Sequence, residues 1–558
     1  MAGIHGDESQ KDDQSRQQAY AALSIAFICI AIGIPIWWKT TTTYRATLPY
    51  GEIADLAKVQ TVCEIPVTVV LVSDKGTETQ LNSLQQQLDY SLVSDVSGRY
   101  SKLSLHYQVR VRNANAREKD VFQLKSTFKD LDSDLRRLHE ESDIGSSMVY
   151  VLQDHNHLFT SSRAYIGKYR HAFVFGQDMK EAAELAARVV REIHVHEAFV
   201  AKIHGTATGV KHTEADVESM RSLRSTQGYE LTFTLLNPDP SMVVAKWDIA
   251  DGIRSYLDPF LKKLAEFAEF KVNSQVLYYM ELAVSPKYDE AGQRYVLKSK
   301  VLPHLITPVE AKLGSHVSTN PTLNFLVYVP TKYHSPLYIL NEKDEPIMSN
   351  AFLSPRWGGI MIYNSPETEA NQTLPETVEV EMKSVMEVFL SQLRLLIGVP
   401  KQKSDSDVTI ASPDNTGITD WEFDSIIRAR TLENVAIATS TLQSLSQLLG
   451  QISNMVIRDD IADQVYSAVE AIEMTHGYLE EANLYRAFHS SKRAIQSSEK
   501  AFFDHSLLEL LYFPEDQKFA IYIPLFLPIS IPVLITLLKA IKWMKAQRQK
   551  AKTKSKTE

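Results

Sequence analysis

Cysteine is almost absent from this chain of 558 residues. The sequence contains two cysteines, Cys29 and Cys63, and Cys29 lies inside a long apolar run. A disulfide therefore cannot close within the region that follows this run, and the fold of that region depends on burial of apolar side chains. Several hundred residues are available, which is enough for a large hydrophobic core.

The sequence also lacks the short motifs that mark many catalytic and nucleotide-binding sites. It contains no Gly-x-Ser-x-Gly, no Gly-x-x-x-x-Gly-Lys and no Gly-x-Gly-x-x-Gly pattern after a strand. Cys63 is followed by Glu64, whose negative charge raises a thiol pKa, whereas activation of a thiol requires a lower one. A histidine distant in sequence could still reach Cys63, and an enzyme built on scattered acids or serines would leave no such pattern. We expect no catalytic residue.

Two histidine pairs are candidates for a metal site, His155 with His157 and His194 with His196. The second pair lies in a predicted helix, where residues i and i+2 point about 200° apart. It also lacks the second histidine of a His-Glu-x-x-His motif. The first pair has only Asp154 beside it, which leaves a zinc ligand set incomplete. We expect surface or structural histidines, and neither a metal nor another cofactor.

Charged residues are missing from two long apolar stretches. The first lies between Arg16 and Lys39 and the second between Lys518 and Lys539. A helix of about 20 residues crosses the roughly 30 Å hydrocarbon core of a bilayer. A cleaved signal peptide is the alternative for the first stretch, but this stretch is long and ends in two tryptophans and a lysine, which are typical of the membrane interface. We predict two transmembrane helices, over residues 19–38 and 519–538.

The residues beyond the second stretch predict the orientation. Residues 539–558 contain eight Lys or Arg and one acidic residue. By the positive-inside rule this basic tail stays in the cytosol, and two spans then place residues 1–18 there as well. The region between the spans would lie in the lumen of the secretory pathway. Residues 19–538 carry a net charge of −14, which disfavours nucleic acid as a partner.

Strands and helices alternate through residues 39–400. A continuous β-branched run such as residues 65–72 is typical of a strand buried on both faces. The alternation predicts an α/β fold, a mixed or parallel sheet covered by helices, which could form two units over residues 60–205 and 228–398. The expected strands are 65–72, 103–111, 148–152, 172–175, 231–235, 272–282, 295–302 and 323–329, and the expected helices are 79–92, 121–140, 179–203, 248–270 and 377–397.

Composition changes after residue 400. Residues 401–416 are rich in charged and small polar side chains that cannot bury an apolar face, so we predict a linker there. From residue 417 to 518 the apolar residues have helical spacing. This pattern predicts a helical bundle close to the membrane.

Three prolines recur at intervals of four in the second apolar stretch, Pro524, Pro528 and Pro532. On a helix they form one stripe, and each removes the amide that would bond the carbonyl four residues earlier. Lipid cannot satisfy the released carbonyls, so we expect this helix to pack against other transmembrane helices.

Two short motifs indicate modification and location. Asn371-Gln372-Thr373 is an Asn-x-Thr sequon in a polar stretch, which predicts glycosylation of Asn371 in a lumenal loop. Lys554 and Lys556 have the Lys-x-Lys-x-x spacing of a signal that returns proteins to the endoplasmic reticulum. Such a signal is read by receptors and is not an anchor.

Two long segments resemble the PIG-S family of subunits of the glycosylphosphatidylinositol (GPI) transamidase. They are residues 33–50, which read GIPIWWKTTTTYRATLPY, and residues 513–528, which read FPEDQKFAIYIPLFLP. The resemblance implies an endoplasmic-reticulum membrane complex that cuts a C-terminal signal from a precursor protein and attaches a GPI anchor. In that family a cysteine-protease-like subunit carries the chemistry, and PIG-S is an accessory component without catalytic residues.

Two classes of function follow from these observations. The first is a noncatalytic structural subunit that binds the other transamidase subunits and membrane lipid, with the GPI lipid and the precursor protein as further candidate partners. The second is a stand-alone lumenal hydrolase or transferase. A cell-surface receptor is disfavoured by the retrieval-like tail.

Overall fold

The structure is a computed structural model that describes residues 5–41, 44–73, 77–93, 102–139, 144–153, 158–159, 162–208, 226, 228–313, 320–365, 374–402, 405–452, 455–508 and 515–554. The chain divides into two units. We call residues 1–53, 441–467 and 497–558 the terminal unit, and residues 54–440 and 468–496 the central unit.

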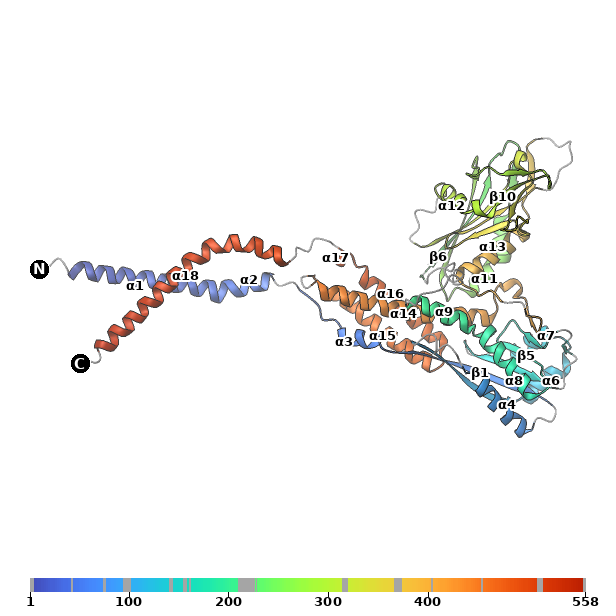
Figure 1. The fold of residues 1–558 in the computed structure, drawn as a ribbon, viewed down its shortest axis with the longest axis horizontal. Helices are drawn as coiled ribbons and strands as arrows, with labels where there is room; N and C mark the ends of the chain where they lie inside the picture. The colour runs from blue at the N-terminus through green and yellow to red at the C-terminus, as the bar shows by residue number, and fades with distance from the viewer. Residues whose placement is uncertain are drawn as a thin grey trace. The chain divides into compact units, whose positions relative to one another are not determined.

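A six-stranded sheet forms the first part of the central unit, and its strands β1 and β5 are labelled in Figure 1. The strand order is β16-β4-β5-β3-β1-β2. Neighbouring strands are parallel, except that β4 and β5 are antiparallel. The strands are β1 Thr61–Val72, β2 Leu103–Asn113, β3 Ser147–Leu152, β4 Ala164–Ile166, β5 His171–Val174 and β16 Val408–Ile410.

Helices cover both faces of this first sheet. Val69 and Leu71 of β1 belong to one core, together with leucines of α4 and alanines of α8. Val70, which points to the opposite face, packs in a second core with Phe122 of α6 and Leu131 of α7. The helices are α4 Glu78–Ser91, α6 Ala116–Leu124, α7 Phe128–Leu138, α8 Met179–Val189, η3 Val190–His194 and α9 Glu197–Ala207.

A second sheet follows, in the order β13-β14-β11-β6-β8. It is parallel apart from the antiparallel pair β13 and β14. Phe325 of β11 packs toward α13 in the large core, and Leu326 packs on the opposite face. The strands are β6 Gly228–Asn237, β8 Glu269–Tyr278, β11 Thr322–Tyr328, β13 Ala351–Ser354 and β14 Gly358–Ile362.

Smaller elements complete the second part of the central unit. A three-stranded sheet has the order β12-β10-β9, and β15 pairs in parallel with β7. These strands are β7 Val243–Lys246, β9 Lys287–Asp289, β10 Arg294–Lys298, β12 Leu337–Leu340 and β15 Glu376–Glu379. The helices are α10 Ile249–Gly252, η5 Ile253–Leu257, α11 Asp258–Lys263, η6 Ser299–Val301, α12 Pro303–Glu310, η8 Lys332–His334 and α13 Met382–Ile397.

Long helices make up the rest of the chain. Within the predicted helical segment 417–518, leucines 442, 445 and 449 are buried, whereas Met474 is 37% exposed. The elements are α1 His5–Ile28, η1 Cys29–Gly33, α2 Ile34–Thr41, α3 Tyr50–Leu56, η9 Asp414–Thr416, α14 Asp420–Gln451, α15 Asp459–Glu480, α16 Leu484–Phe502, α17 His505–Leu508 and α18 Glu515–Lys554.

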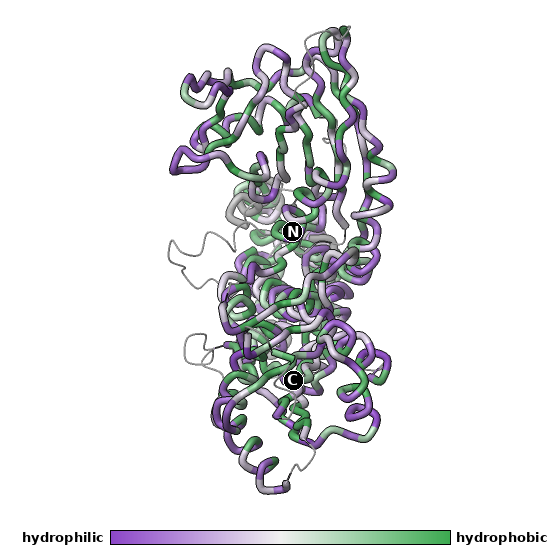
Figure 2. The backbone as a smooth tube through the Cα atoms, turned by 90° about the vertical axis from the view of Figure 1, so that its right-hand side faces the viewer, coloured by the Kyte–Doolittle hydropathy of each residue, from purple (hydrophilic) through white to green (hydrophobic). Residues whose placement is uncertain are grey.

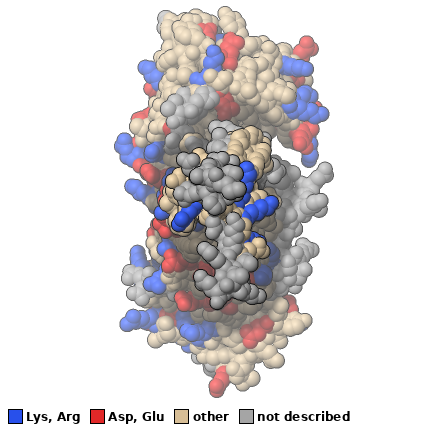
Figure 3. Space-filling model, turned by 90° about the vertical axis from the view of Figure 1, so that its left-hand side faces the viewer, with Lys and Arg blue, Asp and Glu red and all other residues tan. Residues whose placement is uncertain are grey.

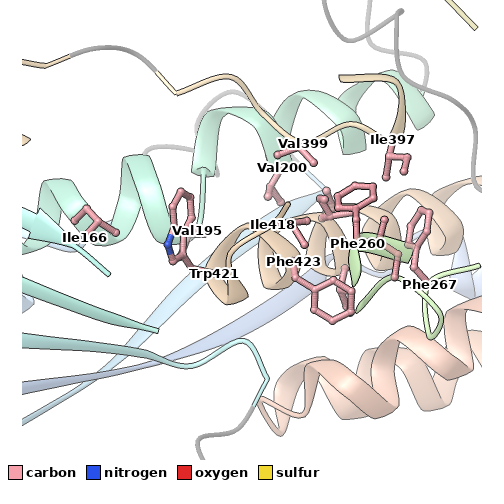
Figure 4. Packing of buried hydrophobic residues seen from close by; sticks show 14 of the residues in the cluster. Ile166, Val195, Val200, Phe260, Phe267, Ile397, Val399, Ile418, Trp421 and Phe423 are labelled. Atoms are coloured by element: carbon pink, nitrogen blue, oxygen red, sulfur yellow. The ribbon is translucent and has the colours of Figure 1, made fainter. Parts of the chain in front are cut away.

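The N-terminal end of α14 lies in the largest core of the central unit. Trp421 and Phe423 cluster with Phe260 of α11 and with Phe267, and Figure 4 shows part of this cluster. The Trp421 indole donates a hydrogen bond to the carbonyl of Gly167 at 3.0 Å. One helix therefore contributes side chains to the core shared by both sheets. Hydrophobic residues concentrate along the strands and hydrophilic residues at turns, as Figure 2 shows.

The α/β class with parallel-rich sheets covered by helices is confirmed, but two predicted helices are interrupted. The helix predicted over 121–140 is two helices, because Thr127 caps a new helix by accepting a hydrogen bond from the amide of Asp130. The helix predicted over 179–203 breaks at His196, whose φ of 56° is left-handed. Local backbone geometry overrides the apolar spacing at both points.

Three other segments also differ from the sequence-based expectation. The helix predicted over 248–270 ends at Lys263, and β8 begins at Glu269. The helix predicted over 377–397 is preceded by β15, in which buried and exposed residues alternate. The predicted linker, 401–416, contains β16, which extends the first sheet by pairing with β4. Pairing with a distant strand gives these short polar segments their structure.

Candidate functional site

The first apolar stretch forms one continuous helical segment through α1, η1 and α2. Residues Arg16–Lys39 are long and apolar enough to cross a membrane. Their large side chains are exposed, with Phe27 at 68% and Trp38 at 64%. A contiguous apolar surface of this length requires a bilayer or a protein partner to cover it.

The second apolar stretch lies in α18 and is bent. The helix axis turns by 45° between the segments Ala520–Pro528 and Ser530–Ala546. The two segments together form a second candidate membrane span if they cross the membrane as one bent helix. Pro524, Pro528 and Pro532 all lie inside α18 and are exposed. The missing proline amides explain the bend. In this chain alone, the proline stripe is uncovered.

Helices α1 and α18 contact each other within the terminal unit (Figure 1). The rings of Trp37 in α2 and Tyr522 in α18 also meet edge to face, with centroids 6.2 Å apart. Among the side chains of these two helices that the structure describes, the buried ones are small, namely Ala19, Ala26 and Ala540. Small residues let two helices approach closely.

The segment after the first apolar helix is anchored to the helices of the terminal unit. The Arg45 guanidinium donates hydrogen bonds to the carbonyls of Leu449, at 2.7 Å, and Ile452, at 3.2 Å. The Tyr44 hydroxyl donates to Asp459 at 2.6 Å. A cation at the C-terminal end of α14 satisfies carbonyls that the helix leaves unpaired. In the sequence, this segment is marked only by its resemblance to the PIG-S family.

Cys63 is not placed as a nucleophile. It lies in β1 with 2% of its surface exposed, and burial raises the pKa of its thiol, although the nearby Arg428 opposes this effect. A buried thiol with a raised pKa is inert toward substrates in solution.

The structure brings together three polar residues that sequence reasoning missed. Ser104 Oγ lies 2.9 Å from His106 Nε2, and His106 Nδ1 lies 3.1 Å from Glu64 Oε1. Glu64 and His106 are opposite each other in the parallel pair β1 and β2, a register that local sequence does not reveal. The His106 side chain is 57% exposed, whereas a Ser-His-acid triad depends on a dry, preorganised site.

The remaining candidate residues have mixed outcomes. His194 is buried, stacks on Trp421 and lies against Ser147. No group of three or more His, Cys, Asp or Glu suited to a metal ion occurs in the parts of the chain that the structure describes. His155, His157, Asn371 and Lys556 lie outside those parts, and α18 ends at Lys554.

Comparisons with known proteins agree over almost the whole chain. Residues 24–547 match the family "PIG-S: Phosphatidylinositol-glycan biosynthesis class S protein". The chain is 44% identical over 529 residues to the rat protein named "GPI-anchor transamidase component PIGS", covering 93% of this chain and 94% of the rat protein.

Relatives from human and yeast extend this similarity. Identity to the human "GPI-anchor transamidase component PIGS" is 42% over 543 residues, which cover 96% of this chain and 97% of the human protein. Identity to the Saccharomyces cerevisiae "GPI transamidase component GPI17" is 25% over 549 residues, covering 94% and 91%. On this near full-length similarity, the chain belongs to the PIG-S family.

Proposed function

We propose that this chain is a noncatalytic structural subunit of the GPI transamidase in the endoplasmic reticulum, where it supports attachment of GPI anchors to precursor proteins. The observation that carries this proposal is the near full-length similarity to proteins named as components of that enzyme. The buried, inert thiol of Cys63 supports a division of labour in which another, cysteine-protease-like subunit performs the chemistry.

The proposed topology has two spans with both termini in the cytosol. The exposed apolar helix Arg16–Lys39 and the bent helix in α18 supply the spans, and the basic residues after Lys539 supply the orientation. Asn371 then lies in the lumen and is glycosylated, and Lys554 with Lys556 return the protein to the endoplasmic reticulum.

Two measurements test this topology. Peptide N-glycosidase should shift the electrophoretic mobility of the wild-type chain and leave Asn371→Gln unchanged. A C-terminal tag should be removed by protease added to sealed microsomes. Protection of the tag would contradict the topology.

A double variant tests the retrieval signal. Lys554→Ser with Lys556→Ser should release the chain from the endoplasmic reticulum, and unchanged location would show that these lysines are not the signal.

The proposed partners are the other transamidase subunits and membrane lipid. The exposed stripe of Pro524, Pro528 and Pro532 supports a contact between α18 and transmembrane helices of another subunit, because released carbonyls in hydrocarbon cost several kcal/mol each.

Affinity isolation tests the assembly role. The full chain should be isolated from membranes in a mild detergent and all retained proteins identified. The proposal predicts stoichiometric recovery of transamidase subunits, and recovery of the chain by itself would overturn it.

The second candidate function is a stand-alone lumenal hydrolase. The observation that favours it is the arrangement of Ser104, His106 and Glu64. It predicts turnover by the purified chain that disappears in Ser104→Ala. The solvent exposure of His106 weighs against this alternative.

A further inference from the structure

A cleft lies in the central unit between elements of its two sheets. Its volume is about 440 Å³, within the range of small-molecule sites. Three lysines and one carboxylate line it, together with an aromatic ring and small apolar groups. The lining residues are Lys129, Lys168, Tyr169, Lys263, Pro413, Asp414, Thr416 and Ile418. We call it the lysine cleft.

Lys168 is held rigidly in the turn between β4 and β5. Its backbone amide donates to Asp132 at 2.7 Å, and its carbonyl accepts from the amide of Asp420 at 2.8 Å. The preceding residue is Gly167, where a Cβ atom would lie 2.4 Å from the Asp132 carboxyl carbon. The turn is therefore fixed on both sides, and Lys168 enters the cleft from a preorganised backbone.

Two lysines converge on a single carboxylate oxygen. Lys168 pairs with Oδ2 of Asp414, and Lys129 Nζ lies 3.9 Å from the same atom. Burial, followed by repulsion from Lys129, lowers the pKa of Lys168. Asp132 also attracts Lys168, but its carboxylate already accepts from the amides of Lys168 and Tyr169 and contacts His171. The two ammonium groups around Asp414 are therefore only partly neutralised.

The third lysine adds to this imbalance. Lys263 Nζ lies 2.7 Å from Asp420, and the same carboxylate faces Arg136 at 2.6 Å. Arg170 lies 3.7 Å from Asp420 but pairs mainly with Asp424, so Lys263, Arg136 and Arg170 share two carboxylates. Elsewhere, as on the face drawn in Figure 3, acidic and basic side chains are interspersed. Three lysines around one lining carboxylate depart from that pattern.

We propose that the lysine cleft binds a phosphate group, with Lys129 and Lys168 as its main ligands and Lys263 adding charge. Asp414 occupies the position of the anion in this structure and is displaced or repelled when phosphate enters. Lysine is a common phosphate ligand because its ammonium group contacts oxygens from several directions. The Tyr169 ring and Ile418 form a wall for an organic group attached to the phosphate. This proposal does not depend on the assembly role.

The test measures phosphate binding to the purified full chain in a neutral detergent. Inorganic phosphate is titrated at constant ionic strength, and binding is followed by the rise in the thermal unfolding midpoint and by equilibrium dialysis. We expect saturable binding that weakens roughly tenfold in Lys168→Gln and in Lys129→Gln, the size expected for loss of one charge-assisted contact. Asp414→Asn should strengthen binding, because it removes the competing carboxylate.

Matched controls exclude a general charge effect. Lys180 is 69% exposed and lies 3.9 Å from Glu184, as Lys129 is 67% exposed and lies 3.9 Å from Asp414. Lys180→Gln and Glu184→Gln should leave phosphate binding unchanged. Equal effects at both pairs, or no saturable binding to any phosphate compound, would overturn the proposal. Asp414→Asn keeps every lysine. Its effect on phosphate binding therefore tests the proposal even if a lysine variant fails to fold.

Two further titrations identify the source of the phosphate. Soluble inositol 1-phosphate and micelles containing phosphatidylinositol are compared with inorganic phosphate in the same variants. Tighter lysine-dependent binding of the soluble ester assigns a free phosphate ester, and binding of the micelles alone assigns a lipid headgroup. Either result supports the site, whereas binding insensitive to Lys129→Gln, Lys168→Gln and Asp414→Asn would refute it.

Discussion

Asp424 accepts two hydrogen bonds from the guanidinium of Arg170, one from Nε at 2.6 Å and one from Nη2 at 2.8 Å. Both side chains are buried, with 4% and 10% of their surfaces exposed. The pair joins the turn before β5 to α14, and Asp424 also accepts from the amide of Gly145 at 2.9 Å.

Removal of this buried carboxylate should destabilise the chain strongly. Asp424→Ala removes the carboxylate that accepts from Nε and Nη2 of Arg170 and from the Gly145 amide, which costs about 3 kcal/mol in free energy of unfolding. Lys58→Ala breaks a pair whose partners are 74% and 76% exposed, so its cost should be below about 1 kcal/mol. Denaturant unfolding of the full chain in detergent measures both, and equal effects would contradict the assignment.

Two glycines should respond in opposite directions to alanine. Gly358 has a φ of +135°, and a Cβ there would lie 1.9 Å from the carbonyl oxygen of Asn324. Gly358→Ala should therefore cost at least about 3 kcal/mol or prevent folding. Gly477, inside α15, has open space around its Cβ position, so Gly477→Ala should stabilise by roughly 0.5 to 1 kcal/mol. A gain at Gly358 would show that the backbone of β14 is described wrongly.

His194 should make stability depend on pH. Burial, then the neighbouring His171 and Arg170, lower the pKa of His194 to about 3. The unfolded chain takes up a proton near pH 6.5 and the folded chain does not, so this contribution is present above pH 6.5 and is lost as pH falls toward 3. His194→Gln should reduce the slope of unfolding free energy against pH, between pH 6 and 4, by up to about 1.4 kcal/mol per unit. Parallel curves for wild type and variant would contradict the burial of a neutral imidazole.

The proline stripe of α18 should matter for assembly more than for insertion. Pro528→Ala with Pro532→Ala restores two backbone amides and should reduce the 45° bend. We expect an unchanged amount of chain in membranes and several-fold less copurified transamidase. Ser530→Ala is the control, since the Ser530 hydroxyl donates to the carbonyl of Leu527 in its own helix. Full copurification in the double proline variant would argue against a proline-facing partner.

Local sequence patterns predict the buried elements well. The β-branched run 65–72 lies within β1, and residues 69–72 are buried on both faces as predicted, whereas residues 61–68 alternate between buried and half-buried. Leucines 442, 445 and 449 are buried, as their helical spacing indicates. In both β1 and α14, the residues that carry the sequence pattern are the same residues that form the buried element.

Elements that depend on distant partners are not readable in this way. β16 is a strand because Val408–Ile410 pairs with β4, which lies more than two hundred residues earlier in the chain. No local sequence pattern predicts this pairing. The apolar spacing places the start of this helix at residue 121, whereas α6 begins at Ala116. Asn115 and Glu118 form a capping box there, which is a local sequence signal for the true start. The lysine cleft combines residues from α7, the β4–β5 turn, α11 and the loop after β16, so only the fold brings them together.

The most direct test of a structural, noncatalytic subunit combines assembly and activity in one experiment. Full-length chain carrying Cys63→Ala and Ser104→Ala is expressed in cells that lack their own copy. The surface level of a GPI-anchored reporter and the copurified transamidase subunits are then measured together. The account predicts that both match wild type, because neither side chain takes part in chemistry. Normal copurification with loss of the reporter would contradict it, since the chain would then supply a catalytic group.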